Sequence, residues 1–135
     1  MKEIIREDIL LTGIQIDDES YNKIRHFANR HHKVYCDHMT MSFGSRIPED
    51  VHKYLCEHDG EEVTLYATSI GRSNDAVALR IITPAPSVNN IKHITVSARK
   101  RPFDSNFIEE WHQLAEAIVL HGVVRVWFNE GTPIV

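Results

Sequence analysis

This chain of 135 residues has few cysteines, no net positive charge and no long apolar run. Its two cysteines, Cys36 and Cys56, are too few for a disulfide framework and favour free thiols. No segment approaches the roughly 20 consecutive apolar residues of a membrane helix. Acidic residues interrupt the first ten positions, where a secretory signal has an unbroken apolar stretch. We therefore expect a cytoplasmic protein with no membrane partner.

The formal net charge of −4 and the pI near 6.1 argue against a broad basic surface for long double-stranded nucleic acid. Basic residues gather locally at Arg99, Lys100 and Arg101. This run is either a solvated turn or a contact for a small or terminal phosphate group, and we include it among the candidate substrate-binding residues.

The composition is that of an ordinary globular protein, with 42% hydrophobic and 25% charged residues, and we expect one domain over residues 1–135. Hydrophobic periodicity and turn residues predict the secondary structure. Strands are expected over 9–16, 33–43, 62–70, 76–83, 91–98 and 123–128, and helices over 19–31, 49–58 and from about 104 to 121. The mixture predicts an α+β fold.

Two segments repeat one arrangement: "HMTMS" begins at His38 and "HITVS" begins at His93. Composition alone predicts far less than one occurrence of His-x-Thr-x-Ser in this chain. Because side chains alternate along a strand, the histidine, threonine and serine of each copy are expected on one face. The apolar residues between them are expected in the core on the other face.

Duplicated histidines suggest acid–base chemistry on a phosphodiester. Two imidazoles across a cleft divide the work, one neutral as general base and one protonated as general acid. The hydroxyls of Thr40 and Thr95 would donate to non-bridging phosphate oxygens. This scheme uses no metal and no cofactor.

The His-x-Thr-x motifs at His38–Thr40 and His93–Thr95 resemble those of the 2H phosphoesterase superfamily, and the resemblance spans most of the chain. Within it, the chain looks most like the cyclic phosphodiesterase domain of plant and fungal tRNA ligases. The resemblance implies a two-lobed α+β fold, with antiparallel sheets flanked by helices around a central cleft. It also implies metal-independent hydrolysis of a 2′,3′-cyclic phosphate, with His38, Thr40, His93 and Thr95 as the catalytic set.

Several alternatives stay open. The substrate is a nucleotide or RNA end with a cyclic phosphate, or a 2′-5′-linked or cyclic oligonucleotide signal. A catalytically silent nucleotide-binding module and a structural protein with repeated strand pairing are the other two classes. The sequence does not reveal the oligomeric state.

Other residues carry secondary hypotheses. Ser42 and Ser97 complete the two motifs and are candidate substrate contacts. Phe103, and less so Tyr35 and Phe43, could stack on a base. Cys36 could pair with His38 as a nucleophile, against the simpler interpretation of a packed thiol. The last set comprises possible metal ligands without a second ligand pair at zinc-site spacing: His31, His32, Cys56 and His58.

Overall fold

The computed structural model describes residues 3–129, and strands account for 50% of it and helices for 21%. The strands are β1 (Glu3–Ile5), β2 (Ile9–Ile16), β3 (Lys33–Val34), β4 (His38–Phe43), β5 (Arg46–Pro48), β6 (Glu62–Arg72), β7 (Ala76–Ile82), β8 (His93–Ala98) and β9 (Trp111–Phe128). The helices are α1 (Asp18–Ile24) and α2 (Glu49–His58), with 3-10 turns η1 (Arg25–Phe27) and η2 (Pro102–Phe107).

Six antiparallel strands close into a barrel. They follow the order β8, β4, β2, β9, β6, β7, and β7 pairs again with β8 to complete the ring. The short β3 adds to β8, and β1 and β5 form a separate two-stranded sheet. The predicted two-lobed α+β fold is therefore wrong, because β4 and β8 lie side by side in one barrel rather than in two facing lobes.

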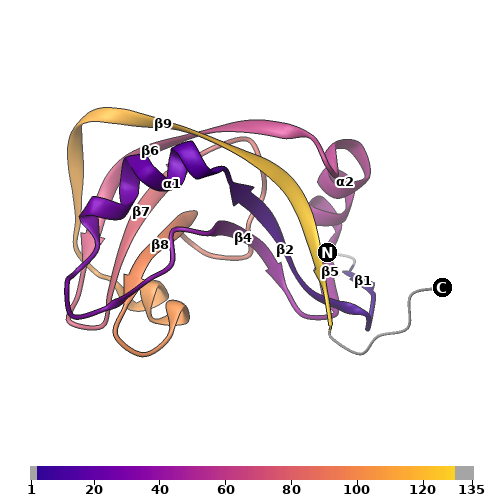
Figure 1. Cartoon of the computed structure of the whole chain (residues 1–135). Coiled ribbons are helices and arrows are strands. Elements are labelled where there is room, and N and C mark those ends of the chain that lie inside the picture. The colour runs from indigo at the N-terminus through magenta and orange to yellow at the C-terminus, as the bar shows by residue number, and fades with distance from the viewer. Residues whose placement is uncertain (1–2, 130–135) are drawn as a thin grey trace.

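The two longest strands arch over the molecule. In Figure 1, β9 runs along the top beside β6, with α1 below it and α2 near the far end of the arch. Both helices cover parts of the barrel, and α1 is capped by the Asp17 carboxylate, which accepts from the Ser20 amide at 2.8 Å. None of the helices in residues 3–129 has the length and apolar character needed to cross a membrane.

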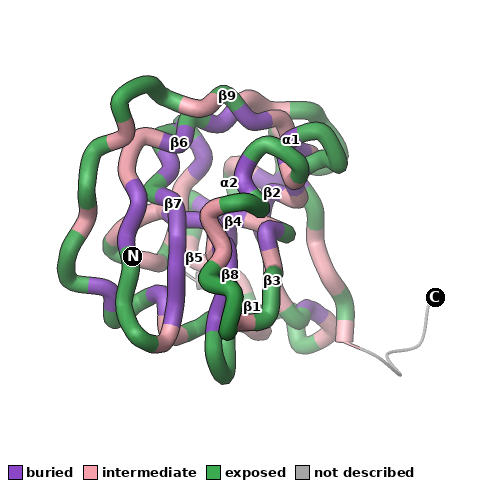
Figure 2. The backbone as a smooth tube through the Cα atoms, turned by 60° about the vertical axis from the view of Figure 1, so that its left-hand side comes forward, coloured by how far each residue is buried: buried purple, intermediate pink, exposed green. Residues whose placement is uncertain are grey.

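The barrel interior is the hydrophobic core, and Figure 2 shows its buried stretches on β4, β6, β7 and β8. Its fully buried large side chains include Ile14, Met39, Met41, Leu65, Leu79, Ile81, Ile94 and Leu120. The apolar residues of both motifs thus pack inward, as the alternating pattern predicted. The opposite face of β4 and β8 is left for the histidines and threonines.

Secondary structure was predicted well except at the first motif strand and near the C-terminus. The single strand expected over 33–43 is wrong, because residues 35–37, with Cys36 at a φ of 47°, interrupt it and leave β3 and β4. Strand β2, helix α2 and the β6–β7 hairpin are confirmed, whereas the helix expected over 19–31 is limited to α1 and η1. The last helix is wrong, since the chain there forms η2 and then the 18-residue strand β9. β9 pairs along its length with β6 and β2, and these ladder hydrogen bonds outweigh a helix-like apolar spacing.

One glycine permits the close approach of β2 to the first motif. Gly13 pairs with Thr40, and a Cβ at Gly13 would lie 2.4 Å from the carbonyl oxygen of Met39. A real side chain there would push the motif backbone outward. Gly13 therefore helps to fix where His38 and Thr40 sit.

Candidate functional site

The two motifs meet as neighbours related by a local two-fold axis. Met39 of β4 pairs with Ile94 of β8 in antiparallel register. Rotation about that pair exchanges His38 with His93 and Thr40 with Thr95. In this register His38 lies opposite Thr95 and His93 opposite Thr40, so all four side chains share one face. The two histidines are then diagonal neighbours with Cα atoms about 7–8 Å apart, a spacing that leaves room for a phosphate group between the rings.

All four motif side chains line one cavity of about 340 Å³. Its wall contains aromatic and apolar groups as well as amide and guanidinium groups. The other lining residues are Leu11, Tyr35, Asp37, Phe43, Asn89, Arg101, Pro102, Phe103 and Asn106. A mostly apolar pocket with a few convergent polar groups is the usual form of a small-molecule site.

The two serines of the motifs turn away from this cavity. Both are fully buried: Ser42 hydrogen-bonds the Thr12 hydroxyl at 2.7 Å, and Ser97 accepts from the Asn29 amide at 3.1 Å. The cause is a β-bulge in each strand. Met41 has no partner between Thr12 and Gly13 of β2, and Val96 has none between Val77 and Ala78 of β7. An extra residue reverses the side-chain alternation beyond it.

The same bulge brings an aromatic ring to the site. Beyond Met41, Phe43 turns to the cavity side, where its ring meets that of Phe103 edge-on at 6.3 Å. Phe103 in turn meets Phe107 at 5.8 Å. All three side chains are exposed, by 45% to 63%; Phe43 and Phe103 line the cavity, whereas Phe107 is not among its lining residues. They form a row of apolar faces open to a ligand.

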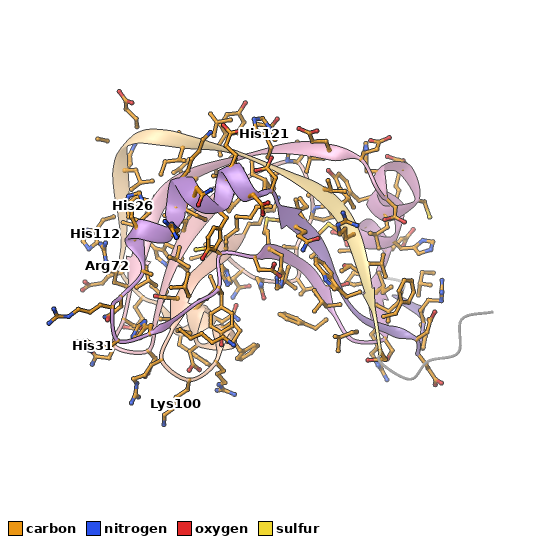
Figure 3. The ribbon with its side chains drawn as sticks, in the orientation of Figure 1. His26, His31, Arg72, Lys100, His112 and His121 are labelled. Carbon is orange, nitrogen blue, oxygen red and sulfur yellow. The ribbon has the colours of Figure 1, made fainter. Side chains whose placement is uncertain are left out.

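The basic run divides between the site and the surface. Arg101 lines the cavity, lies 5.4 Å from the centre of the Phe103 ring and pairs with Asp104 at 2.9 Å. Arg99 pairs with Asp75 at 2.6 Å and is not among the cavity-lining residues. Lys100 is exposed and points away from the body of the protein in Figure 3. Only Arg101 of the three is positioned to meet a ligand in this cavity.

The two imidazoles have different partners. His93 is buried, and its Nδ1 donates to the Ile91 carbonyl oxygen at 2.8 Å. Burial lowers the pKa of His93 below 6.5, the Ile91 hydrogen bond opposes this, and the charge of the nearby His38 adds to the lowering. His38 is half-buried, and its Nδ1 lies 3.0 Å from a carboxylate oxygen of Asp37. Its ring also contacts Trp127, with ring centres 5.2 Å apart.

The two threonine hydroxyls differ as well. Thr95 Oγ1 lies 2.8 Å from Ser105 Oγ and donates to the Pro102 carbonyl at 3.3 Å. Within residues 3–129, no side-chain hydrogen bond engages the hydroxyl of Thr40. The Thr40 hydroxyl can therefore donate directly to a ligand, whereas the Thr95 hydroxyl must first give up one of its present hydrogen bonds.

The candidate nucleophile Cys36 and the candidate metal ligands are not among the residues that line this cavity. Cys36 is buried, donates weakly to the Val96 carbonyl at 3.5 Å, and has its pKa raised to about 11 by burial, so its thiol is not an activated nucleophile. His32 bridges Ser97 and the Asn74 carbonyl. In Figure 3 the labelled histidines His31 and His121 lie at separate outer edges. No group of three or more His, Cys, Asp or Glu side chains suited to a metal ion occurs in the described part of the chain.

Neither a known family model nor a curated protein sequence matches this chain. Membership of the 2H superfamily therefore stays a prediction from the two motifs. Sequence reasoning missed Asp37, Asn89, Asn106 and Trp127. Asp37 had a signal, since a carboxylate directly precedes the first motif histidine. The other three come from distant segments, and only the fold brings them here.

Proposed function

We propose that this protein is a metal-independent phosphodiesterase that hydrolyses a 2′,3′-cyclic phosphate on a nucleotide or RNA end. One observation carries the proposal: the two His-x-Thr motifs are related by a local two-fold axis and line a single cavity. A phosphate on that axis would lie between the two imidazoles, with the two threonine hydroxyls near its non-bridging oxygens. The resemblance of both motifs to the 2H phosphoesterase superfamily supports the same chemistry.

His93 is the better candidate for the general base. A carbonyl can only accept a hydrogen bond, so the neutral ring must carry its proton on Nδ1, where Ile91 accepts it. Nε2 is then left with a lone pair. Because the pKa of His93 is lowered by burial, the ring is neutral at pH 7 and able to take a proton from water.

His38 is the better candidate for the general acid. The Asp37 carboxylate accepts from Nδ1 and forms an ion pair when His38 is protonated. Nε2 then carries the other proton. In the reaction, a water oxygen bonds to phosphorus and its proton passes to His93, while the breaking bond leaves a ribose oxygen that takes the proton of His38. Proton exchange with solvent restores both rings.

Hydroxyl and guanidinium groups complete the site. Thr40 and Thr95 would donate to the non-bridging oxygens as negative charge grows in the transition state. Arg101, on the cavity wall, would add a positive charge. The exposed rings of Phe43 and Phe103 would stack on the nucleobase, as aromatic side chains do in proteins that bind single-stranded RNA.

The cellular setting is part of the proposal. Both cysteines are free, in agreement with a reducing compartment such as the cytoplasm. The exposed row of phenylalanines favours an unpaired nucleotide over a duplex. A 2′-5′-linked or cyclic oligonucleotide would fit the same two-histidine chemistry and is included in the test.

Hydrolysis is expected to survive EDTA, because imidazoles and hydroxyls supply both proton transfer and charge stabilisation in this scheme. The measurement is turnover of 2′,3′-cyclic mononucleotides and of 2′-5′ and 3′-5′ dinucleotides, with products resolved by phosphorus NMR. Activity lost on chelation and restored by zinc or manganese would overturn the mechanism. Saturable binding without turnover would indicate a silent nucleotide-binding module. The absence of both binding and turnover would indicate a structural protein.

A further inference from the structure

A second cavity, of about 330 Å³, adjoins the one that holds the motifs. The two share Asn89, His93, Phe103 and Asn106, so the candidate base His93 and the exposed Phe103 ring stand in the wall between them. The proposed hydrolysis of a cyclic phosphate makes no use of this second space. Any group bound there would lie beside the phosphate, on the His93 side.

The second cavity is lined by amides. Its lining residues include Asn89, Asn90, Asn106 and Ser105. In residues 3–129, no hydrogen bond engages the side-chain amides of Asn89 and Asn90, and Asn106 uses only its NH₂ group, toward the Phe103 carbonyl at 3.1 Å. Amides offer donors and acceptors together, which is the pattern that the edge of a nucleobase requires.

The same space is lined by Trp111, whose buried indole N–H has no partner within residues 3–129. Trp111 Nε1 is the one buried side-chain polar atom in the described part of the chain that makes no hydrogen bond. Trp111 lies on the wall of the second cavity beside Ile108. Buried indole N–H groups normally find an acceptor. A ligand oxygen or nitrogen in the cavity would provide one, after a small shift of the ring.

We infer that the second cavity binds a second nucleoside of the substrate, with its base against the asparagine amides and the Phe103 ring. The natural substrate is then a chain of at least two nucleotides rather than a mononucleotide. This inference rests on the proposed function, which assigns the cyclic phosphate to the first cavity. The exposed Phe107 ring lies 5.8 Å from the Phe103 ring and extends the aromatic surface beyond the two cavities.

The kinetic test compares a dinucleotide ending in a 2′,3′-cyclic phosphate with the corresponding cyclic mononucleotide. The dinucleotide is expected to have a KM about tenfold lower, the worth of one or two additional hydrogen bonds. Asn90 lines the second cavity but not the first, so Asn90→Ala should remove this preference and leave the mononucleotide KM unchanged. Asn22→Ala, at an exposed position on α1, is the matched control.

A binding test is independent of turnover. The chain has two tryptophans, and Trp127→Phe leaves Trp111 as the only one. A 2′-deoxy dinucleotide with a 3′-phosphate cannot be cleaved by this route, and its binding should quench Trp111 fluorescence, whereas a deoxymononucleotide should not. Quenching in this variant, together with no turnover of any cyclic phosphate by the wild-type protein, would reject the proposed function but keep the subsite. Turnover of the mononucleotide with neither quenching nor a lower dinucleotide KM would reject the subsite alone.

Discussion

Replacing either His38 or His93 with alanine is expected to lower kcat/KM for a cyclic phosphate by about 10²–10⁴-fold, the usual worth of a positioned acid or base. Each ring moves one proton in the same step, so the loss of either leaves the other without a complementary partner. The double variant should lose little more than the worse single variant, because residues that act as a unit are not additive. The measurement is steady-state hydrolysis across a pH series.

The fold should tolerate these changes. The core side of both strands is formed by Met39, Met41, Ile94 and Val96, which the substitutions leave in place. His93 is itself buried, so His93→Gln provides a second variant that keeps a polar side chain of similar length. His112→Ala, at an exposed position on β9, is the matched control and should retain full activity. A folded His38 or His93 variant with near-normal turnover would end the two-histidine account.

The pH profile of the wild-type protein should be bell-shaped. The base must be neutral, and the pKa of His93 lies below 6.5, so activity should fall as the pH drops through that lowered value. The alkaline limb reports loss of the proton from the general acid. As the two rings interact, the two midpoints belong to the pair rather than to either residue alone.

Removing the Thr40 hydroxyl is expected to lower kcat by about 10–100-fold, somewhat below the usual cost of one transition-state hydrogen-bond donor in a preorganised site. Thr40→Val is the informative substitution because it preserves the shape of the side chain. Thr95→Val should cost less, since Thr95 already shares its hydroxyl with Pro102 and Ser105 and gives up a bond on binding.

The control for this prediction restores the hydroxyl alone. Thr40→Ser should recover most of the activity that Thr40→Val loses, and a thermal melt should place both variants near the wild type. Equal activity in the valine and serine variants would mean that the Thr40 hydroxyl makes no contact with the reacting phosphate. A raised KM with unchanged kcat would assign Thr40 to ground-state binding.

The sequence predicted which face the motif side chains occupy better than it predicted the fold that carries them. Strict alternation placed Met39 and Ile94 in the core and His38 and His93 on the opposite face, as found. It failed at Ser42 and Ser97, because each strand has a bulge just before the serine. Bulges depend on the register with neighbouring strands, and a single strand's pattern does not contain that information.

The largest error came from β9. Its apolar residues at Trp111, Leu114 and Ile118 fit a helical stripe, and spacing alone does not distinguish that stripe from a long, twisted strand. Pairing with β6 and β2 decides the conformation, and the paired residues lie at least 40 positions apart in the sequence. Closure of the barrel depends on the same long-range pairing. The same pairing also brings the Trp127 ring into contact with the His38 ring.

The central claim is that His38 and His93 face one phosphate-binding cavity, and NMR of the imidazole C–H groups during titration with a 3′-mononucleotide tests it most directly. Both ring signals should move along one saturation curve, because one bound phosphate meets both rings. The exposed His112 should not respond. In the free protein, His93 should titrate below 6.5. Movement of only one ring at saturation, or two curves with different midpoints, would contradict a shared site.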